Sequence, residues 1–215
     1  MGRKGSDLVM FDGKISAADL IADIISEADI AYPVSERSYV GWLNAAEQLI
    51  YSEIIKEQRE IRLEREDIEK DVIKLSNISV PAGEDNIRFE DIYTVYVGSK
   101  QLIKTTLTSG KLFDDTYYKS AENLGFNCPY AKAYGIRILY FARPKLKTVS
   151  ETGEISRENV CLPPEFTDIL RAKLRGEAYK IANEDVLAAK WLNDYNVLIE
   201  TFKEWIKQRE SAFSM

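Results

Sequence analysis

The spacing of apolar residues changes twice along this chain, and that change limits the folds it can adopt. Near both ends, apolar residues recur every three or four positions, which is the period of an amphipathic helix. Between them, runs rich in Val, Ile, Phe and Tyr show a partial alternation that is typical of strands. The chain has 215 residues, enough for one domain or two small ones. The order therefore predicts an α+β fold, a mostly helical frame with an inserted small β-rich unit.

Two helices are predicted in the first part of the chain. Ser16 is a suitable N-cap for a helix over residues 17–28, and Ser35 for a longer helix that begins at Glu36. The short connection between them favours an αα-hairpin. Residues 56–74 are densely charged with alternating sign, and opposite charges three or four positions apart predict the solvated end of the second helix.

The middle of the chain carries the strand signals. Strands are expected at residues 71–80, 87–97, 101–103 and 134–141. Gly98 and Ser99 form the predicted turn between the second and third of these. Asp114 is expected to begin a short helix over residues 114–124, and the polar residues 145–159 predict a loop or irregular hairpin.

The last quarter opens with a helix-start signal. Pro163 and Pro164 fix φ near the helical value and lack backbone donors, and Glu165 follows in the first turn. Helices are predicted over residues 163–182 and 184–209. Large apolar residues of both helix pairs are expected in the core of the helical frame or in a subunit interface: Trp42, Leu43, Trp191, Tyr195 and Phe202. The last three are expected to pack against the first helix pair.

These patterns divide the chain into five segments. Residues 1–15 are predicted to form a flexible N-terminal arm, 16–70 the first helix pair, 71–160 the inserted β-rich unit, 161–210 the second helix pair and 211–215 a tail. The second helix pair is expected to complete a frame that the first pair begins. The β-rich unit would then be held between them.

Composition argues against several kinds of chemistry. The chain has no histidine, which removes Ser-His and Cys-His nucleophilic sites and His-ligated zinc. Its net charge of −6 argues against broad affinity for nucleic-acid phosphates. Cys128 and Cys161 have no CxxC spacing, which indicates free thiols in a reducing compartment. No apolar run reaches the roughly 18 to 20 residues of a membrane span, and no signal peptide is expected.

Paired carboxylates are the one catalytic alternative that the sequence offers. Six acids could in principle hold a magnesium ion for phosphoryl chemistry: Glu84, Asp85, Glu90, Asp91, Asp114 and Asp115. Adjacent acids at the start of a helix are more often caps and dipole partners. No catalytic residue, metal ligand or cofactor is therefore assigned.

The tyrosines of the middle segment allow a second alternative. Four of them could stack on nucleic-acid bases: Tyr93, Tyr96, Tyr117 and Tyr118. Clustered arginine and lysine residues, which such a surface needs, are not found around them. A place in the core of the β-rich unit or in a subunit interface is favoured instead.

A series of short motifs, in a fixed order and spacing, covers residues 16–210. The motifs are VSE at 34–36, WLNAA at 42–46, VPAGED at 80–85, YGIRIL at 134–139 closed by Pro144, LPPEF at 162–166, GEA at 176–178, NED at 183–185, and AAKW at 188–191 followed by Tyr195. This order resembles the head–tail adaptor, or head-completion, proteins of tailed bacteriophages. The polar residues 145–159 depart from the pattern of that family.

The resemblance implies a structural virion protein without catalysis. Copies would form a ring, dodecameric in this family, that docks beneath the portal protein and extends the DNA channel. DNA would pass through without sequence-specific binding, and the ring would offer a platform to a tail or stopper protein. The protein would be assembled in the bacterial cytoplasm and lie in the virion neck. Residues 1–12 and 204–215 would clasp the portal or a neighbouring subunit.

Other classes of protein stay open alongside the adaptor. One is a different phage tail or neck completion protein, for example a tail-tube factor. Another is a metal-dependent enzyme that uses the paired carboxylates, and a third is a cytoplasmic binding module.

Overall fold

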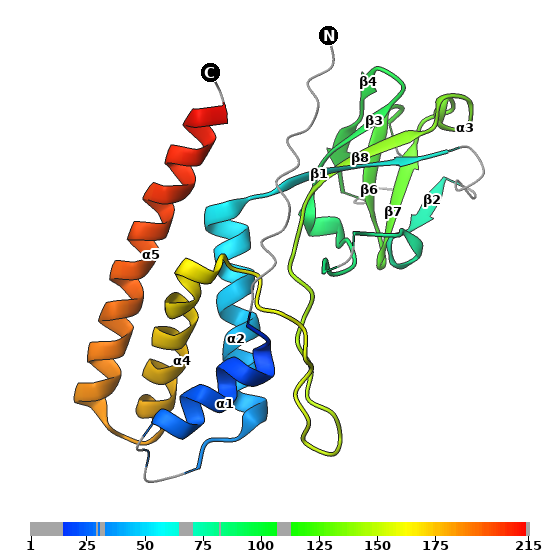
Figure 1. Cartoon of the computed structure of the whole chain (residues 1–215). Coiled ribbons are helices and arrows are strands. Elements are labelled where there is room, and N and C mark those ends of the chain that lie inside the picture. Colours follow the sequence, from blue (N-terminus) through cyan, green and yellow to red (C-terminus); the bar gives the residue numbers. More distant parts are fainter. Residues whose placement is uncertain are drawn as a thin grey trace. The chain divides into compact units, whose positions relative to one another are not determined.

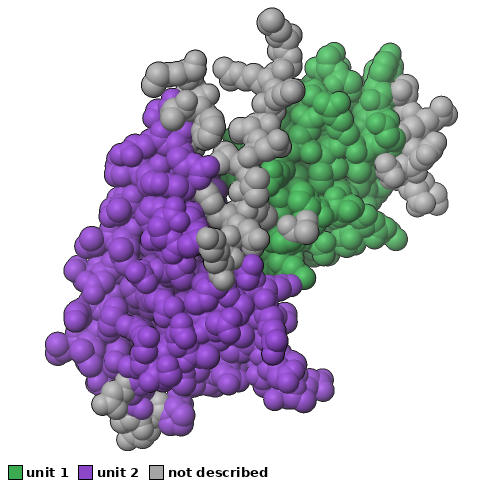
Figure 2. Space-filling model, in the orientation of Figure 1, with its two compact units in different colours: residues 1–6, 56–145 green, residues 7–55, 146–215 purple. Residues whose placement is uncertain are grey.

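The chain folds into two compact units (Figures 1 and 2). The computed structural model describes residues 15–28, 30, 33–64, 71–81, 83–106 and 113–213. The β unit spans Lys56–Lys145, and the helical unit consists of the described residues of Asp7–Ile55 and Leu146–Met215. Helices at both ends and two small sheets in the middle confirm the predicted α+β class.

The helical unit contains two helices from each end of the chain. They are α1 (Ala17–Glu27), α2 (Glu36–Ile50), α4 (Thr167–Ile181) and α5 (Asp185–Phe213). A π-helical turn, Tyr51–Ile55, extends α2, and a 3₁₀ turn, Pro164–Phe166, precedes α4. The predicted caps are confirmed: the Ser16 hydroxyl accepts from the N–H of Asp19, and that of Ser35 from the N–H of Ser38.

α4 is the central helix of this unit. It packs against α5 along its length and also contacts α1 and α2 (Figure 1). A Cβ added to Gly176 would lie 2.7 Å from Cγ of Leu192, so the absence of a side chain permits the close approach of α4 and α5. α4 is the main neighbour of α5, and Trp191, Tyr195 and Phe202 lie in or against the apolar core to which α1 and α2 also contribute.

The β unit contains two sheets within the described residues. One has the order β1 (Gln58–Leu63), β8 (Ile136–Phe141), β3 (Ile92–Val97) and β4 (Lys100–Gln101), all antiparallel. The other has the order β2 (Val72–Lys74), β7 (Asn123–Asn127), β6 (Thr116–Ser120) and β5 (Ile103–Thr105), with β5 parallel to β6. A short helix, α3 (Ala131–Tyr134), and two 3₁₀ turns, Leu75–Asn77 and Phe89–Asp91, complete the unit.

Both sheets contribute to one apolar core. Val95 and Ile138 enter it from the first sheet, and Leu124 and Phe126 from the second, all with at most 1% of their surface exposed. The predicted turn at Gly98 is confirmed, and its φ of 58° is a value that glycine adopts without strain. The β unit thus has a core separate from that of the helical unit.

The prediction of a helix end over residues 56–74 is wrong where the structure describes it. Gln58–Leu63 forms β1, which pairs with β8. Burial alternates along β1, with Ile61 and Leu63 packed against the core. Charges spaced two apart fit the solvent face of a strand as well as the surface of a helix, and pairing with a strand far along the chain selects the strand.

The helix expected from Asp114 is also wrong. Residues 116–127 form the β6–β7 hairpin, in which Ser120 pairs with Asn123 across a two-residue turn. Ala121 has a φ of 52° in that turn, a conformation that is typical of Gly or Asn. The usual signal for the turn is therefore absent from the sequence.

The predicted boundaries of the inserted unit are therefore corrected. It spans Lys56–Lys145 instead of residues 71–160, and the first helix pair ends near Ile55 instead of residue 70. The segment 146–160 belongs to the helical unit, where Val149 and Ile155 form a bridge of the predicted irregular hairpin. Of the predicted arm, residues 1–15, the structure describes only Ile15, and the expected N-terminal clasp at residues 1–12 lies outside the described residues.

Candidate functional site

The five apolar residues singled out from the sequence lie together in the helical unit. Leu43 and Phe202 are fully buried, Tyr195 is nearly so, and Trp42 and Trp191 are half-buried against the same core. Within one chain they therefore serve as core. Residues 204–213, the described part of the expected C-terminal clasp, continue α5.

The end of α5 is fixed by an aromatic cluster. The ring of Phe166 lies 4.8 Å from that of Phe202 and 5.1 Å from that of Trp205, centroid to centroid. Phe202 and Trp205 are themselves stacked at 5.8 Å. Phe166 comes from the turn before α4, so the cluster ties the start of α4 to the last third of α5.

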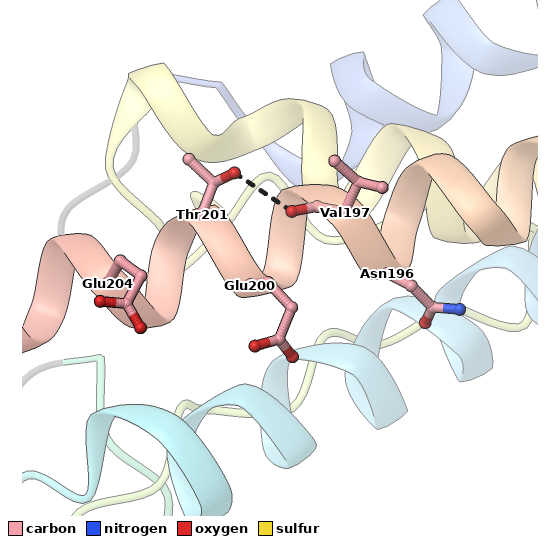
Figure 3. Close-up of a pocket in the computed structure, with 5 residues that line it drawn as sticks. All are labelled: Asn196, Val197, Glu200, Thr201 and Glu204. Atoms are coloured by element: carbon pink, nitrogen blue, oxygen red, sulfur yellow. Dashed lines mark hydrogen bonds between the residues drawn. The ribbon is translucent and has the colours of Figure 1, made fainter.

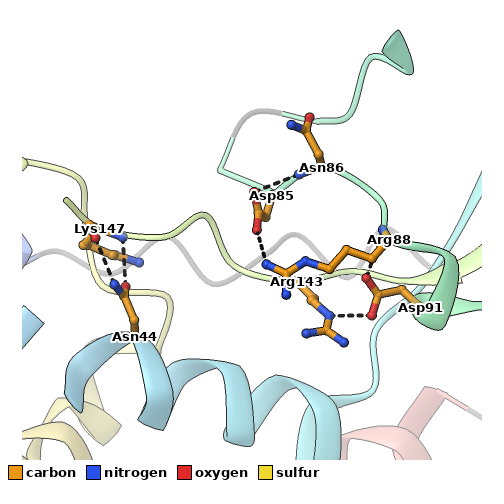
Figure 4. Close-up of polar contacts among 7 residues, drawn as sticks. All are labelled: Asn44, Asp85, Asn86, Arg88, Asp91, Arg143 and Lys147. Carbon is orange, nitrogen blue, oxygen red and sulfur yellow. Dashed lines mark hydrogen bonds and ion pairs between the residues drawn. The ribbon is translucent and has the colours of Figure 1, made fainter. Parts of the chain in front are cut away.

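A buried polar cluster joins α2 to the chain that returns from the β unit. We call this cluster the α2 clamp. Its members are Asn44, Glu47, Lys147 and Cys161. The Lys147 ammonium lies 2.6 Å from Glu47 Oε2 and 3.3 Å from Cys161 Sγ. The backbone N–H of Cys161 donates to Glu47 Oε1 at 2.6 Å. Asn44 binds both the N–H and the C=O of Lys147 at 2.9 Å (Figure 4).

Both charged residues of the α2 clamp are buried. Glu47 and Lys147 are 1% and 3% exposed. Burial alone lowers the pKa of Lys147, but Glu47 and Cys161 outweigh it and the pKa is raised. Burial and then the charge of Glu47 raise the pKa of Cys161 to about 11, so this residue stays a thiol. No local pattern in the sequence indicates this cluster, because Glu47 is separated from Lys147 by 100 positions and from Cys161 by 114.

A second buried network holds the first sheet of the β unit to the loop before β3. Glu84 accepts from Arg59 at 3.0 Å and from the hydroxyl of Tyr140 at 3.0 Å, and Arg59 also lies 2.7 Å from Glu57. Burial is the main cause that raises the pKa of Glu57 to about 7; Arg59 opposes it and Glu84 adds to it. Two buried acids thus share one arginine.

The raised pKa of Glu57 predicts that the contribution of this residue to the stability of the β unit improves as the pH falls. The pKa of Glu57 is raised above its unfolded value, so its contribution is most unfavourable above pH 7 and fades as pH falls toward the unfolded pKa. Glu57→Gln should therefore stabilise the β unit at pH 8 by up to about 3 kcal/mol and have little effect near pH 4.5. Hydrogen exchange of the β1 and β8 amides would measure this, and an unchanged pH dependence in the variant would contradict it.

The six acids considered for a metal site are used in other ways. Their partners within the chain are Arg59 and Tyr140 for Glu84, Arg88 for Asp85, Lys119 for Glu90, Arg143 for Asp91, Asn127 for Asp114 and Lys100 for Asp115. Figure 4 shows two of these pairs, Asp85 with Arg88 and Asp91 with Arg143. In the part of the chain that the structure describes, no three acids or cysteines are grouped to hold a metal ion.

The four tyrosines considered for base stacking do not share one surface. Tyr117 is buried in the core of the β unit, and the ring of Tyr118 covers Gly125. The ring of Tyr93 lies 4.9 Å from that of Phe141, and Tyr96 lies beneath the guanidinium of Arg137. The structure therefore does not bring the four together in one stacking surface.

A shallow depression of about 560 Å³ lies along one side of α5 (Figure 3). Its described lining is Asn196, Val197, Glu200, Thr201 and Glu204. The hydroxyl of Thr201 donates to the carbonyl of Val197 one turn earlier. Each carboxylate is paired with a lysine three residues on, at 2.6 Å. The described lining comes from one helix, and its charges are already compensated, so we assign it no ligand.

Two comparisons with known proteins find no match. A scan against protein-family models finds none that matches the chain, and a search of curated proteins finds no match. Within the described ranges, no helix combines the length and apolarity that crossing a bilayer requires.

Proposed function

We propose that this chain is a structural adaptor that forms a ring beneath the portal of a tailed-bacteriophage head and receives the tail. The observation that carries the proposal is the split helical unit. α1 and α2 precede the β unit in sequence, α4 and α5 follow it, and all four share one apolar core. A helical frame with an inserted β unit is the arrangement expected from the resemblance to head–tail adaptors.

The physical properties of the two units support this role. Each unit has its own core, so each can keep its shape while it contacts a different neighbour. The α2 clamp fixes the returning chain to α2 where the β unit rejoins the frame. Identical subunits joined by head-to-tail contacts close into rings. The net charge of −6 disfavours tight binding of DNA phosphates, as a channel lining requires.

Reconstitution with the portal protein of the same phage tests the proposal. The purified chain should co-sediment with portal particles in a number of copies equal to the portal subunits, and electron microscopy should show an added ring. Portal particles alone and the chain alone are the controls. A chain that neither binds the portal nor is found in the virion neck would overturn the proposal. Its presence at the tail tip would favour a tail-completion protein instead.

A further inference from the structure

Among the described residues, no strand pairs with the outer edge of β1. β1 is the outermost strand of its sheet, and within the described residues β8 is its only neighbour. In an antiparallel pair of strands, every second residue directs its N–H and C=O groups toward the partner strand. The N–H of Ala142 donates to the carbonyl of Glu57, so Glu57 and every second residue after it direct these groups toward β8. Gln58, Glu60 and Arg62 therefore direct their N–H and C=O groups away from β8, along the outer edge.

The exposed face of β1 has one acid between two arginines. Nε of Arg62 lies 2.7 Å from Oε1 of Glu60. Arg137 of β8 is directly opposite Arg62 in the register and lies 3.7 Å from Oε2 of Glu60. Like charges directly opposite each other on a sheet are unfavourable. One carboxylate serves two guanidinium groups, so a second carboxylate beside Arg62 would be stabilising.

A second copy of β1 supplies that carboxylate in one antiparallel register. If two β1 strands pair about a twofold axis at Ile61, Glu60 of each strand lies opposite Arg62 of the other. Glu60 and Arg62 both direct their backbone N–H and C=O groups outward. The same register therefore forms the backbone hydrogen bonds between the two strands and places opposite charges next to each other. Moving the axis by one residue, to Glu60 or to Arg62, places identical charges opposite each other. Charged edges usually block strand addition, but this edge is complementary to itself.

We infer that two copies of this chain associate in solution by antiparallel pairing of their β1 edges, which joins their two sheets into one. The contact involves short strands and buries less surface than a standard interface, so the dimer is weak and depends on concentration. A ring about a single rotation axis has no twofold axis between neighbouring subunits. A twofold β1 contact therefore differs from the contact between neighbours in the proposed ring, and the inference does not rest on the proposed function.

Charge reversal across the strand pair tests the inference on the full chain. Sedimentation over a concentration series should show a dimer for the wild type. Glu60→Arg and Arg62→Glu should each raise the dissociation constant about tenfold or more, because each turns two attractive cross-strand pairs into repulsive ones. Mixing the two variants should restore a dimer, since every arginine at these two positions of one copy then faces a glutamate of the other. Glu122→Arg, an exposed reversal in the β6–β7 turn, should leave the dimer unchanged.

A cross-link tests the register. Ile61→Cys places one cysteine of each copy on the twofold axis, as a non-hydrogen-bonded pair with a Cα separation of about 4.5 Å, which a disulfide can span. Mild oxidation should join the copies, while the buried Cys128 and Cys161 leave the wild type unlinked. A wild type that is monomeric at every concentration, single variants that dimerise like the wild type, or a mixture of variants that stays monomeric would overturn the inference.

Discussion

Lys147→Met is expected to lower the free energy of unfolding of the helical unit by about 3–5 kcal/mol, because it leaves the carboxylate of Glu47 buried without its cation. Glu47 retains the N–H of Cys161 as a partner, but one backbone donor does not compensate a charge in an apolar surrounding. Urea unfolding followed by tryptophan fluorescence measures the effect in this unit alone, since Trp42, Trp191 and Trp205 all lie in α2 and α5.

Two further variants test whether the loss of stability comes from leaving a buried charge without its partner. The double variant Glu47→Leu with Lys147→Met removes both charges and should recover part of the loss, because no charge is left buried. The recovery is incomplete, since the N–H of Cys161 loses its acceptor. Lys203→Met breaks a pair of the same length, 2.6 Å, on the exposed side of α5, and should cost about 0–1 kcal/mol. Equal costs for Lys147→Met and Lys203→Met would mean that the α2 clamp is not buried in solution.

Local signals in the sequence are sufficient for the starts of α1, α2 and the last helix pair. Ser16 and Ser35 cap the helices that they predict, since a cap depends on residues within one turn. The proline pair at Pro163 also marks the start of the last helix pair, again through local backbone geometry.

Features that depend on distant partners cannot be predicted in the same way. The charges of β1 fit both a helix and a strand, and only β8, far along the chain, decides between them. The turn at Ala121 uses a helix-forming residue in a left-handed conformation. Glu47 and Lys147 look like two solvated charges in the sequence, and only the fold brings them together and buries them.

Phe202→Ala is expected to destabilise the helical unit by about 3–5 kcal/mol, the cost of removing a fully buried aromatic ring. The ring lies beside both Phe166 and Trp205, so its loss also leaves two aromatic partners next to a cavity. The measurement is again urea unfolding by tryptophan fluorescence. The emission of Trp205 should shift to longer wavelength in the folded variant, because its stacked neighbour is gone.

Val197→Ala on the same helix is the matched control, because Val197 is 58% exposed and should change the stability by less than about 0.5 kcal/mol. The contrast decides what the apolar face of α5 does. Core packing within one chain makes Phe202→Ala costly in the isolated protein, before any partner is present. A variant that unfolds like the wild type but fails to join the portal would instead show that this face is covered by another subunit. The sequence leaves both roles open for Phe202, and the packing of α5 on α4 favours the first.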